Sequence, residues 1–171
     1  MKIILLGYMG SGKSTIGKAL ANELNLSFID LDHTIEKQMG MTISDFFEAY
    51  GELKFRRLEN EVLNSVLAEN NQMILSTGGG TPCYGNNLQL MKSAPNAKVF
   101  YLKASIKTLT ERLLSEKDTR PLIQSIGDDN LPEFIGKHLF ERSNFYLQAD
   151  YVVDIDQKSV ETIVKEMVEL L

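Results

Sequence analysis

Cysteine and long apolar runs are scarce in this 171-residue sequence. Cys83 is the only cysteine, so the sequence excludes an internal disulfide framework and a multi-cysteine zinc site. Such a lone thiol is better explained as a small, inert residue than as a reactive group. The apolar run Ile3–Leu6 is too short for a membrane span or for the core of a signal peptide. We therefore expect a soluble, cytoplasmic protein with no membrane partner.

Positive charge is also in short supply. The 18 lysines and arginines are outnumbered by 23 aspartates and glutamates, which gives a net charge of −5. Binding to a nucleic-acid backbone demands clustered lysine and arginine, so the charge balance predicts no nucleic-acid partner. A nucleotide could still bind, because one local group of hydrogen-bond donors is enough for its phosphates.

The chain shows no internal repeat, low-complexity tract or Pro/Gly-rich linker, and its length fits a single domain spanning residues 1–171. Short apolar runs alternate with stretches of helical periodicity. Strands are predicted at Ile3–Leu6, Ser27–Leu31, Met73–Ser76, Lys98–Leu102 and Tyr151–Ile155. The alternation predicts an α/β fold, in which helices cover both faces of a five-stranded parallel sheet. Ligands of such folds bind beyond the carboxyl ends of the strands.

A phosphate-loop motif follows the first predicted strand. The residues Gly7-Tyr-Met-Gly-Ser-Gly-Lys-Ser14 match the pattern G-x-x-x-x-G-K-[ST]. Its glycines let backbone N–H groups point inward, and the start of the next helix adds partial positive charge. Lys13 would reach the β- and γ-phosphates of ATP, and the Ser14 hydroxyl would bind Mg²⁺. A glycine turn with an exposed lysine is the weaker explanation. The motif predicts a P-loop NTPase-type fold with ATP bound at Gly10, Ser11, Gly12, Lys13, Ser14 and Thr15.

The phosphate loop alone does not separate a kinase from other P-loop proteins. A GTPase would also carry D-x-x-G and N-K-x-D, and the sequence contains neither motif. An ATPase motor needs coupling elements for which this chain is too short. The residues that would bind an acceptor therefore decide the function.

Two carboxylates, Asp30 and Asp32, lie at the end of the second predicted strand. Alternation along a strand would send both side chains to the same side. One could then hold the water shell of the metal while the other accepts the proton of an attacking hydroxyl. The alternative is an acidic strand end that only caps the next helix.

Arginine and glycine mark two further candidate sites. Only five of the 18 cations are arginines, and arginine suits a two-pronged grip on carboxylate or phosphate. Arg120 lies in the polar segment 115–125, predicted to be a mobile loop, and would suit a lid that brings a cation onto the transferred phosphate. The triplet Gly78–Gly80 would let a ligand approach bare backbone amides. A surface turn and a flexible turn are the respective alternatives.

Taken together, these motifs resemble the shikimate kinase family and follow its order along the chain. The family's phosphate loop has Met9 in place, and a late arginine stands at Arg142. The other family motifs are D-x-D at Asp30/Asp32, F-R-x-x-E at Phe55–Glu59, the glycine triplet at Gly78–Gly80 and R-P-L at Arg120–Leu122.

The resemblance implies transfer of the γ-phosphoryl group of MgATP to the 3-hydroxyl of shikimate, in aromatic amino-acid biosynthesis. Asp32 would bind the hydroxyls of the acceptor and serve as the catalytic base. Arg56 and Arg142 would clamp its carboxylate. The triplet Gly78, Gly79 and Gly80 would offer backbone amides to the acceptor.

The resemblance also assigns the nucleotide side. Asp30 would hold Mg²⁺ through water, and Arg120 would join Lys13 as a catalytic cation. Arg112 and the loop around Gln157 would flank the adenine. A monomer is expected, with an acceptor-binding insertion near residues 31–60 and a lid near residues 112–125.

Two departures from the family pattern are visible. Asn144 and Phe145 stand where relatives usually have proline and leucine, and Gln157 stands where relatives often have arginine. The competing hypotheses are a gluconate or other small-metabolite kinase, a nucleoside monophosphate kinase, and a non-catalytic nucleotide-binding regulator.

Overall fold

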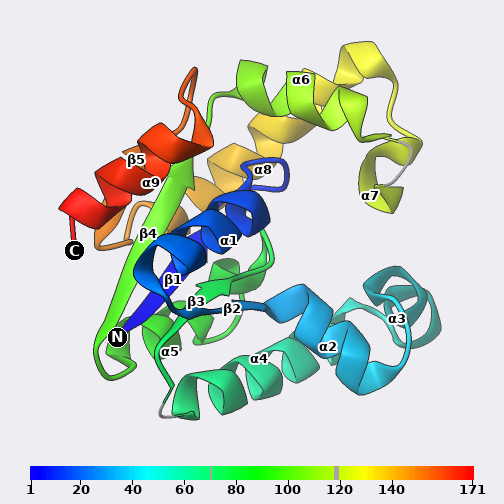
Figure 1. Ribbon diagram of the computed structural model, residues 1–171. Helices are drawn as coiled ribbons and strands as arrows, with labels where there is room; N and C mark the ends of the chain where they lie inside the picture. Colours follow the sequence, from blue (N-terminus) through cyan, green and yellow to red (C-terminus); the bar gives the residue numbers. More distant parts are fainter. Residues whose placement is uncertain (70, 118–119) are drawn as a thin grey trace.

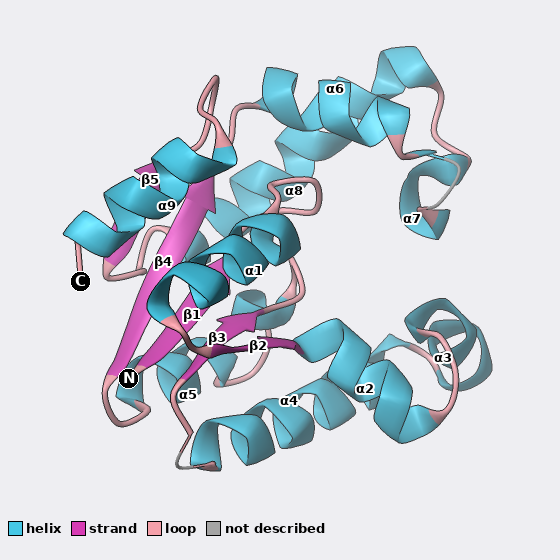
Figure 2. Cartoon of the chain, in the orientation of Figure 1, coloured by secondary structure: helices cyan, strands magenta, loops and turns pink. Residues whose placement is uncertain are grey.

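The structure of this chain, a computed structural model, describes residues 1–69, 71–117 and 120–171. Five parallel strands form one sheet in the order β2-β3-β1-β4-β5 (Figure 1, Figure 2). The strands are β1 (Lys2–Leu6), β2 (Ser27–Asp30), β3 (Met73–Ser76), β4 (Ala97–Lys103) and β5 (Tyr151–Asp154). The predicted five-stranded parallel sheet is confirmed.

Helices fill most of the connections between the strands. The helices are α1 (Lys13–Leu24), α2 (Leu31–Met39), α3 (Ile43–Tyr50), α4 (Glu52–Ala68), α5 (Asn87–Ser93), α6 (Ile106–Ser115), α7 (Pro121–Gln124), α8 (Leu131–Tyr146) and α9 (Val160–Glu169), with the short 3₁₀ turns η1 (Thr81–Cys83) and η3 (Asp128–Asn130). No helix of the described ranges is both long enough and apolar enough to cross a membrane.

Strand β1 separates two apolar cores. Ile3 and Leu5 pack with residues of α1 and α9 on one face of the sheet. Ile4 and Leu6 pack with residues of α4 and α5 on the other face. All four side chains are fully buried, as expected for a central strand of a parallel sheet. The prediction of helices on both faces is therefore confirmed.

The second strand ends one residue earlier than predicted. Leu31 begins α2 rather than ending β2, and Asp30 becomes the N-cap of that helix, with Oδ1 accepting a hydrogen bond from His33 N at 3.4 Å. Asp32 thus lies in the first helical turn. The argument from strand alternation for Asp30 and Asp32 was wrong. Leu31 and Ile35, both buried, show the helical spacing that decided the outcome.

The segment 115–125, predicted to be a loop, contains a short helix. Helix α6 ends at Ser115, and α7 begins at Pro121 with Arg120 as its N-cap. Proline at the first helical position is favourable, since its ring presets the helical φ angle. Ile123 of this helix is fully buried, which ties α7 to the core. Residues 118–119 of the predicted loop lie outside the described residues.

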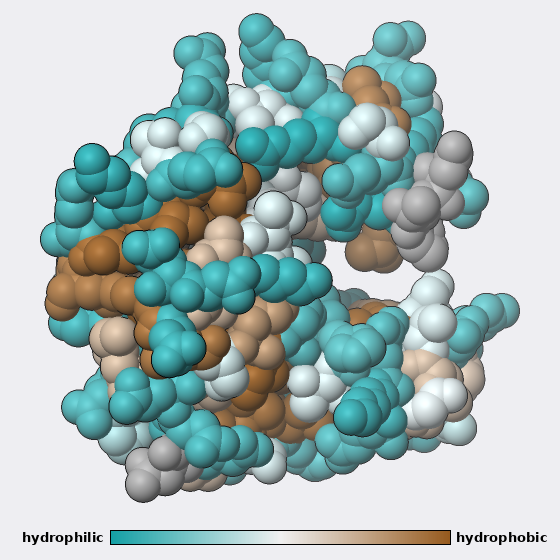
Figure 3. Space-filling view, in the orientation of Figure 1, coloured by the Kyte–Doolittle hydropathy of each residue, from teal (hydrophilic) through white to brown (hydrophobic). Residues whose placement is uncertain are grey.

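The carboxyl ends of the strands all lie at one edge of the sheet, where the loops that follow them meet (Figure 1). At this edge the chain forms an opening, with α7 on one side and α2 and α3 on the other. Figure 3 shows the same opening in the space-filling view. The loops that follow β1, β2 and β3, which carry the phosphate loop, the two aspartates and the glycine triplet, therefore meet at this edge.

Candidate active site

The phosphate loop connects β1 to α1. Gly10 and Gly12 have φ angles of 80° and 86°, in the left-handed region that glycine adopts at little cost. Gly12 is also the N-cap of α1, so the loop places the N-terminus of that helix at the site. Free N–H groups and the helix dipole at this position favour an anion.

Lys13 is the first residue of α1, and its ammonium group folds back onto the loop. Its Nζ donates hydrogen bonds to the carbonyl oxygens of Gly7, at 2.8 Å, and Tyr8, at 3.1 Å. Burial lowers the pKa of Lys13 to about 8, although the charges of Asp32 and Asp30 oppose the shift. A phosphate group in the loop would favour the charged ammonium, so this site is suited to an anion.

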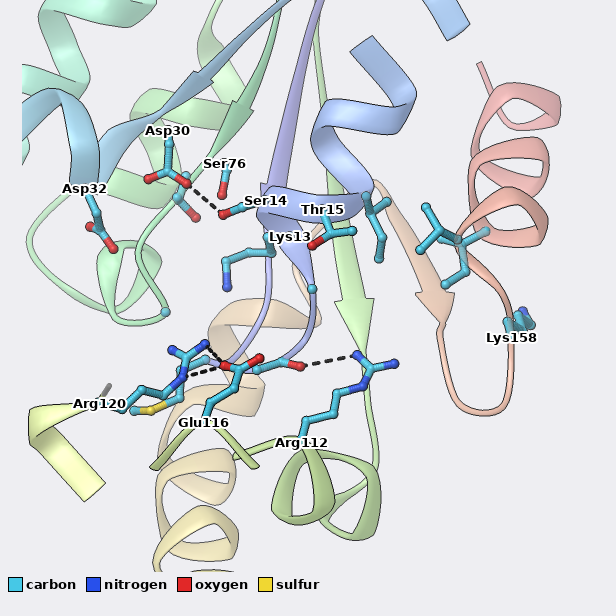
Figure 4. A pocket seen from close by; sticks show the side chains of 18 residues that line it. Lys13, Ser14, Thr15, Asp30, Asp32, Ser76, Arg112, Glu116, Arg120 and Lys158 are labelled. Atoms are coloured by element: carbon cyan, nitrogen blue, oxygen red, sulfur yellow. Dashed lines mark hydrogen bonds and ion pairs between the residues drawn. The ribbon is translucent and has the colours of Figure 1, made fainter. Parts of the chain in front are cut away.

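Ser14 and Asp30 meet beside this loop. The Ser14 hydroxyl donates a hydrogen bond to Asp30 Oδ2 at 2.8 Å, a contact drawn in Figure 4. The described residues contain no cluster of three His, Cys, Asp or Glu side chains that could hold a metal ion by themselves. Two oxygen ligands do fit Mg²⁺, because that ion usually keeps several waters and takes further ligands from substrate phosphates.

Asp32 faces the glycine triplet that follows β3. A Cβ atom placed on Gly78 would lie 2.8 Å from Asp32 Oδ1, so only glycine lets the carboxylate come this close. Burial raises the pKa of Asp32 to about 6, and the charges of Asp30 and Glu59 add to the shift. Asp32 is therefore ionised at neutral pH, yet far more basic than an ordinary aspartate.

These residues line a cavity of about 490 Å³ (Figure 4). In Figure 4 the side chains of Asp30, Asp32 and Lys13 lie across the cavity from Arg112 and Arg120. The candidate residues that line it are Gly10, Gly12, Lys13, Ser14, Thr15, Asp30, Asp32, Gly79, Arg112 and Arg120. The candidates outside its lining are Ser11, Arg56, Gly78, Gly80, Arg142 and Gln157.

The two arginines of the predicted lid are held by different partners. Arg112 Nη1 donates a hydrogen bond to the Gly10 carbonyl at 3.2 Å, which ties α6 to the phosphate loop. Arg120 forms an ion pair with Glu116, four residues earlier in the chain, and its Nε lies 2.8 Å from Glu116 Oε2. Glu116 and Arg120 both line the cavity, so their ion pair forms part of its wall.

Sequence reasoning missed several lining residues. Gln157 has a left-handed φ of 57° and is exposed, whereas its neighbour Lys158 lines the cavity and pairs with Glu166 at 2.6 Å. Val160 and Ile163 of α9 supply apolar surface to the same end of the cavity. The basic residue at 158 was visible in the sequence, but only the turn of this loop decides which side chain points inward.

Arg56 approaches the glycine triplet from α4. Its Nη1 pairs with Glu59 Oε2 at 3.0 Å, and its guanidinium carbon lies 3.8 Å from the ring centroid of Tyr84. Glu59 is only 1% exposed and also accepts a hydrogen bond from Thr81 Oγ1 at 2.7 Å. A Cβ atom on Gly80 would lie 3.0 Å from Arg56 Nη2. Asp32 and Arg56 therefore flank the same turn, at opposite ends of it.

Arg142 lies on α8 near the same turn. Its guanidinium carbon is 5.5 Å from the ring centroid of Tyr8, and its charge contributes to the lowered pKa of Lys13. Tyr146, one turn later, donates a hydrogen bond to the Gly79 carbonyl at 2.5 Å. Helix α8 runs unbroken through Asn144 and Phe145, so the departure from the family pattern leaves Arg142 within the helix. Within the described ranges, Arg142 forms no ion pair.

Comparison with known proteins gives a consistent result. The family model described as shikimate kinase matches residues 9–171. The shikimate kinase of Flavobacterium psychrophilum is 44% identical over 170 residues, which is 99% of this chain and 98% of that protein. The crystal structure of shikimate kinase from Bacteroides thetaiotaomicron has a TM-score of 0.92, with 39% identity and coverage of 99% and 97% of the two chains. Shikimate kinase from Acinetobacter baumannii, solved in complex with shikimate, has a TM-score of 0.89, with 32% identity and coverage of 99% and 91%.

The buried Glu59 is predicted to support this site. Glu59→Ala would leave Arg56 and Thr81 without their common partner, and we expect a loss of about 3–5 kcal/mol in the free energy of unfolding. Urea denaturation measures this loss as a lower midpoint at unchanged slope. Lys137→Ala is the control, since it breaks an exposed pair with Glu133 and should leave the midpoint unchanged. Equal midpoints for both variants would contradict the prediction.

Proposed function

This chain belongs to the shikimate kinase family, and we propose that it transfers the γ-phosphoryl group of MgATP to the 3-hydroxyl of shikimate, giving shikimate 3-phosphate and ADP. The reaction would serve chorismate and aromatic amino-acid biosynthesis. One observation carries the proposal beyond family membership. A carboxylate, Asp32, and a guanidinium, Arg56, flank the glycine turn next to the phosphate loop. An acceptor with hydroxyl groups and a carboxylate needs this pair of opposite charges.

The nucleotide would bind through the phosphate loop. The N–H groups of the loop and the Lys13 ammonium would hold the β- and γ-phosphates. Ser14, and Asp30 through water, would hold Mg²⁺, which neutralises phosphate charge when bound. The adenine would lie at the end of the cavity formed by Arg112, Lys158 and the apolar side chains of α9, with Gln157 nearby.

The acceptor would bind around the glycine turn. Arg56 and Arg142 would clamp its carboxylate, and the backbone of Gly78, Gly79 and Gly80 would approach its ring. Asp32 would bind its hydroxyls and accept the proton of the attacking one. The pKa of Asp32, raised to about 6, supports this role, because a base works best when its pKa is near the working pH.

The lid would complete the site after both substrates bind. Arg120 pairs with Glu116 in this structure, and we infer that the γ-phosphate takes over this guanidinium when residues 112–125 close. The cation would then neutralise charge that develops on the transferred group. Closure would also exclude water, which otherwise competes as phosphoryl acceptor. Residues 31–60 would form the acceptor-binding insertion of a single domain. A cytoplasmic location and a monomeric state stay predictions.

The choice of acceptor is tested by following ADP release with Mg²⁺ and ATP. We expect shikimate to support turnover at an ordinary kinase rate of about 1–100 s⁻¹. Gluconate, AMP and CMP should leave ADP release at its background rate. Turnover with gluconate alone, or with a nucleoside monophosphate alone, would replace the proposal by that rival function. Background release with every acceptor would indicate a non-catalytic nucleotide-binding protein.

Asp32→Asn removes the proposed base while keeping the shape of the side chain. We expect kcat to fall by about 10²- to 10⁴-fold, because the attacking hydroxyl loses its proton acceptor. Binding of MgADP, measured by calorimetry, should persist. Asp45→Asn is the matched control, because Asp45 is an exposed aspartate in the first turn of the next helix. A kcat for Asp32→Asn close to that of Asp45→Asn would refute the assignment.

Arg56→Lys keeps the charge of the proposed clamp and removes its fork of donors. A point charge cannot bind a carboxylate through two parallel hydrogen bonds, so we expect the KM for shikimate to rise by about 10-fold or more. The KM for ATP should change little. The neighbouring Arg57 is exposed, and Arg57→Lys should leave both constants unchanged. An unchanged KM for shikimate in Arg56→Lys would remove Arg56 from the clamp.

A further inference from the structure

One residue of the phosphate loop has no part in the proposed binding of phosphate. Tyr8 follows the first glycine of the loop, and its side chain is only 1% exposed, within the apolar core that also contains Leu131 and Ile135 of α8. Its hydroxyl shares a hydrogen bond with His138 Nδ1 at a distance of 2.9 Å, across 130 residues of sequence. The Tyr8 hydroxyl is thus bonded to a side chain of α8 and is not available to the nucleotide.

His138 lies on α8, one helical turn before Arg142. Residues four apart occupy the same face of a helix, so both side chains reach the same region. The His138 ring packs on Phe134, with centroids 4.2 Å apart, and on Tyr8, with centroids 6.0 Å apart. Contacts on two sides hold the imidazole in place.

Tyr8 contacts both of these residues of α8. Its hydroxyl reaches His138, and its ring face lies under the Arg142 guanidinium, with the guanidinium carbon 5.5 Å from the centroid. A cation over an aromatic face is attracted by the ring. Burial raises the pKa of Tyr8 to about 12, and burial and the charge of Arg142 lower the pKa of His138. At neutral pH the hydrogen bond therefore joins two uncharged groups, and the ring stays a neutral support for the guanidinium.

We propose that Tyr8 and His138 are positioning residues for Arg142. Their hydrogen bond fixes the orientation of the Tyr8 ring, and the ring holds the Arg142 guanidinium beside the phosphate loop, ready for the carboxylate of the acceptor. The proposal rests on the proposed function, in which Arg142 belongs to the clamp. A long arginine side chain that is already ordered loses less freedom when its ligand binds. Neither positioning residue touches the transferred group, so the effect falls on acceptor binding.

The test is steady-state kinetics of the full chain with shikimate and MgATP. Tyr8→Phe keeps the ring and removes the hydroxyl, and His138→Leu removes the imidazole. We expect each variant to raise the KM for shikimate by about 3- to 10-fold, with kcat and the KM for ATP within about 2-fold of the parent. The double variant should resemble either single one, because both changes break the same hydrogen bond. His138→Asn retains an amide near the position of Nδ1 and should restore most of the affinity.

Two controls separate this proposal from the proposed function. Tyr151→Phe removes the hydroxyl of a tyrosine on β5 that stacks on Phe100, and should leave both constants unchanged. Arg142→Lys should raise the KM for shikimate.

If Arg142→Lys has this effect but Tyr8→Phe and His138→Leu do not, the positioning role is wrong and the clamp stands. An unchanged KM in Arg142→Lys would remove Arg142 from the clamp and overturn both assignments. A parallel loss of MgADP binding in Tyr8→Phe would show that Tyr8 acts on the phosphate loop instead, and would overturn the positioning role.

Discussion

The structure depends most on the way Lys13 closes the phosphate loop. Its ammonium bonds to two carbonyl oxygens of the loop from the first turn of α1, and burial makes this charge costly without an anion nearby. The neighbouring turns then pack against the closed loop. A Cβ atom on Gly79 would lie 3.3 Å from the Met9 nitrogen, so the glycine turn meets the loop backbone to backbone. The nucleotide side and the acceptor side of the site are therefore built on one loop.

The acceptor side depends on a second buried charge. Glu59 holds Arg56 through an ion pair and the start of η1 through Thr81, so a single carboxylate sets both the guanidinium and the glycine turn. Around it, Asn87 Nδ2 donates to the Thr81 carbonyl at 2.8 Å, and Asn60 donates to Asn87 Oδ1 at 2.7 Å. Every member of this network has a partner, which is the condition under which buried polar groups add rigidity. The glycines next to this network let a ligand approach the backbone closely, while the network keeps the turn ordered.

The cations of the site differ in how they are held. Arg56 is enclosed by two glutamates and an aromatic ring, and Arg112 is bound to the phosphate loop. Arg120 pairs with Glu116, four residues earlier and itself half exposed, and so its charge can be exchanged for that of a phosphate at low cost. Fixed cations suit recognition, whereas an exchangeable cation suits a lid that acts after binding.

The sequence by itself determined the sheet, the phosphate loop and the family. Those features depend on residues close together in the chain, such as apolar runs of strand length and the spacing of Gly7, Gly12 and Lys13. Only the tertiary structure decided that Asp32 belongs to α2, that α7 is helical, and that Lys158 rather than Gln157 lines the cavity. Local patterns leave such outcomes open, because burial against distant elements overrides them. The contact between Tyr8 and His138 shows most clearly what the sequence leaves open. These residues are 130 positions apart, and their hydrogen bond exists only after folding has brought α8 next to the phosphate loop.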